Sequence, residues 1–408
     1  MRRRVVVTGM GVVSPLGSTL EGIEVALREN RSSVRRMEEW SRVQHMLTRL
    51  GCPADVPELA KLPRKVNRLM GRVSLLATVA TERAIADARL TSDELESGKV
   101  GLAHGSTHGS SSANEEWVRQ LFTNEGLLGL PATGYLKFMS HTTAANLSLH
   151  FKIRGRMMTT CAACVSASQA IGYAYESVRN GVTDVMVCGG AEELHFSHAG
   201  IFDVMHATSS KYNDRPDQSP RPFDRDRDGL VVGEGAGTFV LEEYERAKAL
   251  GKTIHAEVLG FATNCDGTSI TSSSRESMRD AIRAALADAR VSPAEIGYVN
   301  AHATATVLGD QLESEATYDV FGDRVPVSSL KGHMGHTLGA CGAIESALAI
   351  RMMHGGFIAP TLNLDTPDPR CAPLDYVQQK TRAVRFDRFI SNKFAFGGIN
   401  TCLVFGRV

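Results

Sequence analysis

The chain has 408 residues, and its 45 basic and 45 acidic side chains give a formal net charge of zero. This length predicts two domains or one large duplicated unit, and the neutral charge gives no indication of a nucleic-acid partner. No apolar run approaches the roughly 18 residues of a membrane span, and the start lacks the pattern of a signal peptide. The eight cysteines are scattered, as is typical of reduced thiols. We therefore expect a cytoplasmic protein without a membrane partner.

The first half of the chain alternates predicted strands and helices. Apolar runs predict strands at 4–8, 100–105, 184–190 and 237–242, and helical spacing predicts helices at 20–28 and 62–90. Gly9-Met10-Gly11 is interpreted as the turn that ends the first strand.

The same pattern restarts at His255. Strands are predicted at 255–261, 296–300, 325–329 and 401–405, and helices at 276–289 and 339–353. Alternating strands and helices indicate α/β layers. The similar order in residues 1–250 and 251–408 predicts an internal duplication.

Cys164 lies at the junction of a predicted strand and a predicted helix. The stretch from Met157 to Ala167 passes from an apolar run through small residues into helical spacing. Free N–H groups and the dipole at a helix start lower a thiol pKa, so we expect a reactive thiolate. The alternative is a buried structural cysteine. Cys161 and Cys164 also resemble half of a zinc or redox site, but no matching second pair exists, so no metal is expected.

Three glycine-containing stretches in the second half are each expected to follow a strand. They span 300–306 with His302, 328–340 with Lys331 and His336, and 391–400 with Phe396. A thiolate and two histidines suit acyl transfer followed by decarboxylation, because the cysteine carries the acyl group while N–H donors stabilise oxyanions. Each histidine alone has the alternative of a hydrogen-bonded loop residue.

These motifs resemble those of the elongating (type I/II) β-ketoacyl-acyl-carrier-protein synthases, which have the thiolase fold. The resemblance covers nearly the whole chain, with Ala163-Cys164, Asn300-Ala301-His302, Lys331…Gly335-His336 and Phe396-Gly397-Gly398 in this order. It implies an α/β, thiolase-like fold with a duplicated five-layer αβαβα architecture and mixed sheets. It also implies decarboxylating Claisen condensation of an acyl group with malonyl-acyl-carrier protein, in fatty-acid or polyene/polyketide elongation. The stretch around Phe396 is also similar to synthases of specialised pathways, such as aryl polyene formation.

The resemblance implies a catalytic role for several residues. Cys164 is the acylated nucleophile, and His302 and His336 assist malonyl decarboxylation. Lys331 orients this network, with Glu345 behind it. Asp310 and Glu313 resemble the supporting acids of the family.

The resemblance also implies how substrate is bound. Thr304 and Thr306 resemble the hydroxyls that bind the phosphopantetheine arm of the carrier protein, and no other cofactor is implied. The backbone N–H groups of Cys164 and Phe396 resemble the oxyanion hole, and Phe396 resembles the gate of the family.

Three residues depart from the family pattern. Ala303 stands where the family usually has glycine, and a positive φ there costs alanine on the order of 1 kcal/mol. Lys393 and Ala395 replace smaller or more flexible residues near the gate, so they put gate kinetics and acyl preference in doubt.

A basic stripe precedes the centre of the first half. Five cations fall in twelve residues with no acid among them, namely Lys61, Arg64, Lys65, Arg68 and Arg72. A helix over 62–90 would place the three arginines on one face. The stripe is either a solvated face or, as the resemblance implies, a docking face for an acidic acyl-carrier protein. The resemblance further implies a homodimer, or a heterodimer with a related subunit.

Two other functions are compatible with this fold. A CoA-dependent thiolase needs a second catalytic cysteine near the C-terminus, and none of Cys341, Cys371 and Cys402 lies in a suitable Cys-Gly loop. A non-catalytic chain-length partner subunit of a heterodimeric synthase would lack the nucleophile, whereas Cys164 is present.

Overall fold

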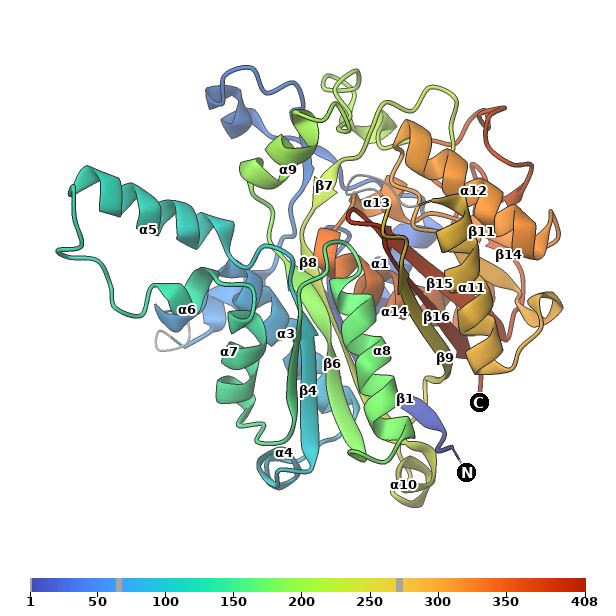
Figure 1. Ribbon diagram of the computed structural model, residues 1–408, viewed down its shortest axis with the longest axis horizontal. Helices are drawn as coiled ribbons and strands as arrows, with labels where there is room; N and C mark the ends of the chain where they lie inside the picture. Colours follow the sequence, from blue (N-terminus) through green and yellow to red (C-terminus); the bar gives the residue numbers. More distant parts are fainter. Residues whose placement is uncertain (1, 64–67, 269–273) are drawn as a thin grey trace.

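One mixed sheet of eleven strands forms the centre of the molecule (Figure 1). The computed structural model describes residues 2–63, 68–268 and 274–408. The strand order is β13-β11-β10-β15-β16-β9-β1-β8-β6-β4-β5. The N-terminal half contributes β1 (Val5–Val13), β4 (Val100–Gly105), β5 (Met157–Thr160), β6 (Val185–Glu192) and β8 (Gly235–Glu243). The C-terminal half contributes β9 (Ala256–Cys265), β10 (Tyr298–Asn300), β11 (Pro326–Ser328), β13 (Asp375–Tyr376), β15 (Arg388–Ala395) and β16 (Ile399–Gly406).

The two halves of this sheet repeat one topology. From β1 outward the order is β1-β8-β6-β4-β5, and from β9 outward it is β9-β16-β15-β10-β11. With the edge strand β13 left aside, each half of this sheet has five strands, and in both series the first, last, fourth, second and third of them follow one another. In both, the final three strands are parallel and the second is antiparallel to its neighbours. The strand order thus supports the predicted duplication, and β1 joins β9 antiparallel at its centre.

Helices fill the space between and outside the two half-sheets. α8 (Ser166–Arg179) and α14 (Cys341–Gly355) pack against each other and contact strands of both halves. α3 (Arg72–Asp87) and α7 (Thr142–Phe151) cover the N-terminal half, and α11 (Arg275–Ala289), with α12 (Val307–Phe321) beside it, covers the other. Buried side chains occur all around α14, as expected for a helix between two sheet faces. The thiolase-like five-layer fold is confirmed.

The remaining elements are short and lie around this core. The helices are α1 (Leu20–Arg28), α4 (Ser92–Glu96), α5 (Ser111–Thr123), α6 (Tyr135–Phe138), α9 (Phe196–Asp203), α10 (Tyr244–Ala249) and α13 (Lys331–Met334). Single 3-10 turns are η1 (Glu38–Arg42), η2 (Pro57–Lys61), η3 (Pro216–Gln218), η4 (Pro293–Glu295) and η5 (Leu338–Ala340). A three-stranded sheet contains β2 (Arg35–Arg36), β3 (Leu50–Cys52) and β7 (Val232–Gly233). A two-stranded sheet contains β12 (Phe357–Ile358) and β14 (Arg382–Ala383).

The predicted turn at Gly9-Met10-Gly11 is wrong, because β1 runs through it to Val13. A Cβ atom on Gly9 would lie 2.2 Å from the carbonyl oxygen of Ala84, and one on Gly11 would lie 2.0 Å from that of Ala80. Both carbonyls belong to α3. The glycines therefore allow a helix to approach the strand closely.

The single helix predicted over 62–90 is also wrong. Residues 68–69 are helical, the chain leaves the helix at Met70 and Gly71, and α3 begins at Arg72. Gly71 marks the break because a Cβ there would lie 2.3 Å from Cβ of Ser110 and 2.4 Å from the carbonyl oxygen of Lys137. The chain passes close to α5 and α6 at this point, and Gly71 adopts an extended backbone (φ −78°, ψ 169°) as the N-cap of α3.

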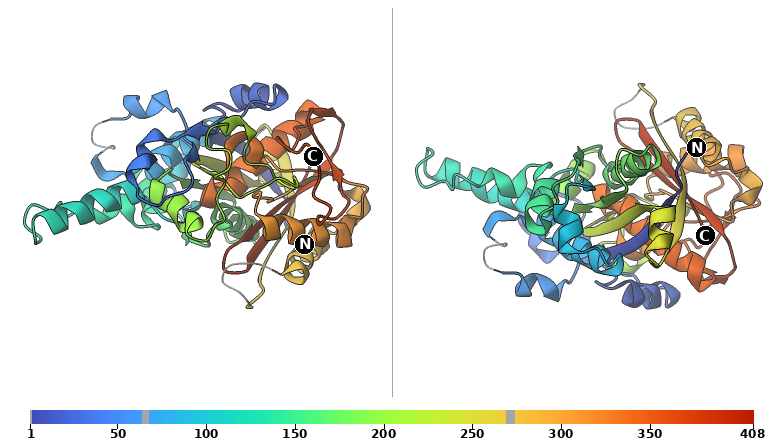
Figure 2. Two further views of the ribbon diagram at one scale, coloured as in Figure 1. Left: turned by 90° about the horizontal axis from the view of Figure 1, so that it is seen from above. Right: turned by 90° about the horizontal axis from the view of Figure 1, so that it is seen from below.

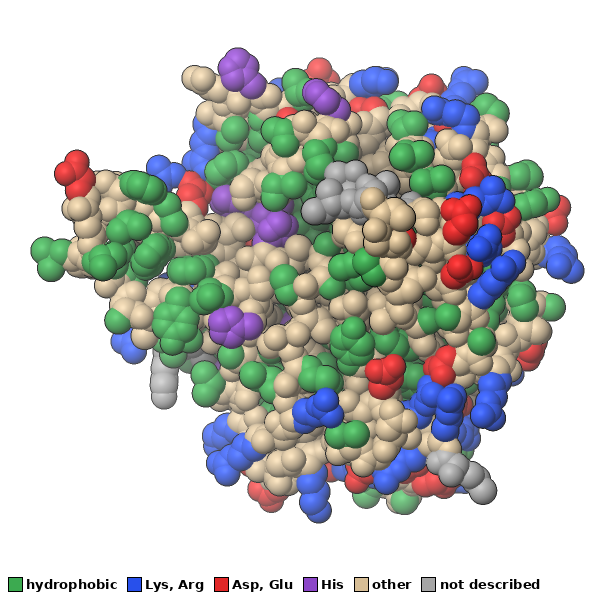
Figure 3. Space-filling model, viewed as in Figure 1, with side chains coloured by type: hydrophobic (Ala, Val, Ile, Leu, Met, Phe, Trp, Pro, Cys, Tyr) green, Lys and Arg blue, Asp and Glu red, His purple; other side chains and the backbone are tan. Residues whose placement is uncertain are grey.

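α5, α6 and the loop between them form an arm that projects from the body in all three ribbon views (Figures 1 and 2). Apolar side chains gather on it (Figure 3), with Phe122 75% and Leu128 91% exposed. None of the helices in the described ranges combines the length and the apolarity needed to cross a membrane.

Candidate active site

Cys164 lies in a tight turn between the end of β5 and the start of α8, as predicted. The residue before it, Ala163, has a φ of 48°. Ser166 fixes the turn, because its Oγ accepts from the N–H of Ala162 at 2.9 Å and donates to the carbonyl of Ala163 at 2.8 Å. Thr107 Oγ1 donates to the same carbonyl at 2.9 Å. The nucleophile therefore sits on a rigid support.

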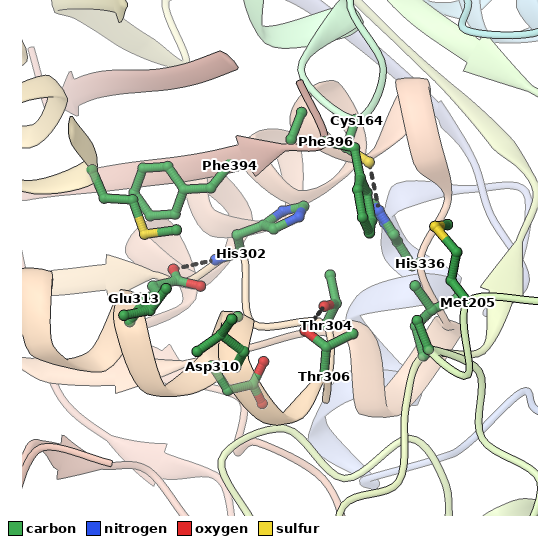
Figure 4. Close-up of a pocket in the computed structure, with 17 residues that line it drawn as sticks. Cys164, Met205, His302, Thr304, Thr306, Asp310, Glu313, His336, Phe394 and Phe396 are labelled. Carbon is green, nitrogen blue, oxygen red and sulfur yellow. Dashed lines mark hydrogen bonds between the residues drawn. The ribbon is translucent and has the colours of Figure 1, made fainter. Parts of the chain in front are cut away.

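Three side chains from distant parts of the sequence meet at this turn (Figure 4). Nε2 of His336, which follows α13, lies 3.0 Å from Sγ of Cys164. The ring of His302, in the loop after β10, stands edge-on to that of His336 with centroids 5.1 Å apart. One donor atom from each of the three residues lies within 4.8 Å of the others. The structure thus brings the predicted nucleophile and both predicted histidines together.

Burial decides the charge of these groups. It raises the pKa of the Cys164 thiol, the nearby Cys341 adds to the rise, and Lys331 opposes it. The predicted lowering of this pKa is therefore wrong, because burial outweighs the helix dipole. Burial, together with Lys331 and Lys393, lowers the pKa of His302 and His336 well below its usual value, and His336 adds to the effect at His302. A neutral thiol thus faces neutral imidazoles, and Nε2 of His336 is placed to accept the thiol proton.

Two buried carboxylates hold the loop that carries His302. Glu313 accepts the N–H groups of His302 and Ala303 at 2.7 and 2.6 Å, and Asp310 accepts that of Ala305 at 3.1 Å. Burial raises the pKa of Asp310 to about 6 and that of Glu313 to about 7. The positive φ considered for Ala303 occurs instead at Ala305, with a φ of 68°. Both predicted supporting acids therefore orient backbone, and neither reaches the sulfur.

Lys331 and Glu345 form a fully buried ion pair, with Nζ 2.7 Å from Oε1. Lys393 Nζ lies 2.9 Å from the other oxygen of the same carboxylate. Sequence reasoning treated Lys393 only as a departure near the gate, whereas the structure places it inside β15 with its side chain in the core. The expectation that residues 391–400 follow a strand is wrong, because 391–395 belong to β15 itself. A lysine between Ile390 and Phe394 is the signal that could have indicated a buried cation.

A cavity of about 440 Å³ opens onto Cys164, His302 and His336. Thr304 and Thr306 line it, with their hydroxyl oxygens 3.1 Å apart, and so does Phe396. The Phe396 ring lies 5.5 Å from that of Phe202. Several apolar lining residues were missed because nothing in their local sequence marks them, namely Met205, Leu230, Met278, Leu308 and Phe394. The cavity is wide enough for a flexible chain and mostly apolar.

The described residues of the basic stripe do not form one face, because the helix breaks at Met70 and Gly71, between Arg68 and Arg72. Lys61 and Arg68 are exposed, whereas Arg64 and Lys65 lie outside the described residues. Arg72 has a structural role, because its guanidinium binds the buried carboxylate of Glu234 at 2.5 and 2.8 Å. Including Arg72 in a free docking face was therefore wrong.

The sulfur and imidazole groups of the site are also ligand types that bind zinc. A closed structural zinc site needs four ligands, and among the described residues no fourth His, Cys, Asp or Glu joins Cys164, His302 and His336. The arrangement suits a nucleophile with two imidazole partners.

Comparison with known proteins agrees with this geometry. The family models described as the N-terminal and C-terminal domains of β-ketoacyl synthase match residues 2–247 and 255–365. The 3-oxoacyl-[acyl-carrier-protein] synthase 1 of Haemophilus influenzae is 34% identical over 99% of both chains. A crystal structure of a β-ketoacyl synthase from Burkholderia phymatum STM815 is 49% identical, with full coverage of both chains and a TM-score of 0.96. The ishigamide ketosynthase/chain length factor is 31% identical, again with full coverage of both chains, and has a TM-score of 0.92. The chain belongs to the β-ketoacyl synthase family.

Proposed function

We propose that this enzyme condenses an acyl group held on Cys164 with malonyl-acyl-carrier protein, releasing CO2 and forming a β-ketoacyl-acyl-carrier protein. The observation that carries the proposal is the convergence of Cys164, His302 and His336 on one cavity. The relatives that are 3-oxoacyl-[acyl-carrier-protein] synthases support the carrier protein as the form of substrate.

Acyl transfer comes first. Sγ of Cys164 attacks the thioester carbon of the incoming acyl group, and the thiol proton passes to Nε2 of His336 at 3.0 Å. The carbon–sulfur bond to the phosphopantetheine breaks, and that sulfur takes up the proton and leaves as a thiol. His336 thereby returns to its neutral form.

Decarboxylation follows with the malonyl thioester in the same cavity. In this step the neutral imidazoles of His302 and His336 donate hydrogen bonds to the thioester oxygen from Nε2. His336 must therefore change tautomer after acyl transfer, because the form that accepts the thiol proton on Nε2 carries its own proton on Nδ1. The bond to the carboxylate breaks, CO2 leaves, and its electron pair becomes the enolate. The enolate carbon attacks the acyl carbon on Cys164, and the sulfur leaves with the electron pair. The thiolate then takes up one proton from solvent, which balances the negative charge left when the carboxylate departs as CO2.

The cavity argues against a thiolase. That reaction requires a second cysteine beside the substrate, and no cysteine other than Cys164 is among the residues that line the described cavity. Cys341 is the nearest candidate, but it is buried and its Sγ donates to the carbonyl of Cys164 at 3.3 Å. A purely structural partner subunit is disfavoured because the nucleophile is present and bonded to a histidine.

Two measurements test the proposal. Incubation with acyl-carrier protein charged with an acyl group should add one acyl mass to the enzyme, and malonyl-carrier protein should then release CO2. Cys164→Ala is the control, and the exposed thiol of Cys161 makes the control necessary. An adduct that persists in this variant would contradict the assignment.

We also propose that the carrier protein docks near the exposed cations Lys61 and Arg68. An acidic partner would be attracted there, and such charges act mainly on the association rate. Reversing them should raise KM for carrier-bound substrates at low salt and spare small thioesters.

The assembly that we propose is a dimer, either of two copies or with a related subunit. The projecting arm supports it, because Phe122, Leu127 and Leu128 are large apolar side chains that it exposes to solvent, and exposed apolar patches mark interaction sites. The related ishigamide protein is a ketosynthase/chain length factor. Light scattering of the purified chain alone separates the two forms, and Leu128→Glu should weaken either.

A further inference from the structure

The mechanism described above gives no role to Lys393, although its ammonium group is buried. Its side chain is fully buried in β15, and Nζ lies within 3.2 Å of four oxygen atoms. These are Asn300 Oδ1 at 2.9 Å, the Asn392 carbonyl at 2.8 Å, Ser391 Oγ at 3.2 Å and Glu345 Oε2 at 2.9 Å.

The hydrogen-bond directions around this nitrogen require a charged amine. Ser391 donates its hydroxyl proton to Asn300 Oδ1 at 3.0 Å, so the serine oxygen can only accept from Lys393. The other three atoms are a carbonyl, an amide oxygen and a carboxylate oxygen, which are acceptors. A nitrogen surrounded by acceptors alone is an ammonium that donates three hydrogen bonds.

One carboxylate serves two lysines. Glu345 contacts Lys331 through Oε1 and Lys393 through Oε2, and all three side chains are fully buried. The group of three carries one net positive charge. This charge lies beside the loop of His302, because Lys393 Nζ donates to Oδ1 of Asn300, two residues before His302. Both lysines contribute to the lowered pKa of His302 and of His336.

We propose that Lys393 is a positioning residue that keeps a second positive charge near His302 and His336, so that both imidazoles stay neutral and the enolate is stabilised. The inference rests on the proposed function, since the enolate arises only in decarboxylation. Acyl transfer to Cys164 needs this charge less, because its proton moves directly between Cys164 and His336.

Lys393 acts on both histidines together with Lys331. The titratable groups of the site lie on several elements. These are Lys331 on α13, Glu345 and Cys341 on α14, Glu313 and Asp310 on α12, and Cys164 before α8. Lys393→Met removes one of the two cations and leaves the Lys331–Glu345 pair neutral. The histidines then bind protons more readily, so the inactive protonated form persists to higher pH.

The test is the pH profile of CO2 release from malonyl-carrier protein, compared with the rate of Cys164 acylation. We expect Lys393→Met to move the acid limb upward by about one pH unit, which is a tenfold loss at a pH on that limb. Acylation at pH 8 should stay within about threefold of the parent. Lys380→Met, at an exposed lysine, is the matched control and should leave both unchanged.

A second variant separates charge from hydrogen bonding. Lys393→Gln keeps N–H donors for Asn300 and Asn392 but carries no charge. It should therefore shift the acid limb of the CO2-release profile as Lys393→Met does. It also provides the measurement if the methionine variant does not fold. The inference would be overturned if the acid limb of the pH profile did not move in either folded variant. It would also be overturned if Lys393→Gln showed the same pH profile as the parent. A parent enzyme that released no CO2 would instead overturn the proposed function.

Discussion

The two histidines should differ in which step they affect, although the sequence presents them as a pair. We consider His302→Ala and His336→Ala, each measured in acylation and in decarboxylation. His336 Nε2 lies 3.0 Å from Sγ of Cys164, whereas no hydrogen bond joins His302 to this sulfur. Because burial raises the thiol pKa, acylation needs a base at the sulfur. His336 supplies it and His302 does not.

The magnitudes follow from these roles. Loss of one donor to a developing oxyanion costs about 10²–10³ in rate, or about 3–4 kcal/mol, so either variant should lose this much in CO2 release. Loss of a general base costs about 10²–10⁴, so His336→Ala should lose acylation by about that factor as well. His302→Ala should acylate within about threefold of the parent.

Acylation is followed by intact-protein mass over time, and decarboxylation by release of labelled CO2 from malonyl-carrier protein. In the parent, both histidines have a lowered pKa, so CO2 release should remain active below pH 6.5 and decline only as they become protonated. Equal acylation by both variants would refute the base role of His336. Parental CO2 release by either variant would refute the two-donor mechanism.

Three further changes test the packing and the charges. Glu345→Gln leaves two buried ammoniums without their carboxylate and should lower the free energy of unfolding by about 3–5 kcal/mol in denaturant titration. If Glu345→Gln lowered the free energy of unfolding no more than Lys393→Met does, Glu345 would not stabilise both lysines. Gly172→Ala places a Cβ 2.2 Å from the ring of Phe261 and should cost about 1–3 kcal/mol, whereas Gly200→Ala meets no atom within 4 Å and should be neutral or stabilising. Arg72→Glu should lower the melting temperature because it faces the buried Glu234, whereas Arg68→Glu should change only KM for carrier-bound substrates and leave the melting temperature unchanged.

Local sequence predicted most of the repeated strand–helix order and placed the principal reactive residues at strand ends and a helix start, while the family resemblance implied their catalytic roles. Small residues between an apolar run and a helical pattern placed Cys164 at a helix start, and His302, Lys331 and His336 each followed a predicted strand. These features depend on neighbours along the chain, which the sequence displays directly. The duplication was visible as a repeated order of elements, and the strand order of the sheet supports it.

Only the tertiary structure decided how groups distant in sequence act on one another. Gly9 and Gly11 resemble turn residues and Gly71 falls inside a helical pattern, but the role of all three is set by how closely α3, α5 and α6 approach. The helix start at Cys164 predicts a lowered thiol pKa, yet burial among residues from both halves raises it. Lys393 is adjacent to the gate in sequence, but its charge is directed at Glu345 because β15 lies against α14. Burial and the position of charges are sums over the whole fold, so no local pattern contains them.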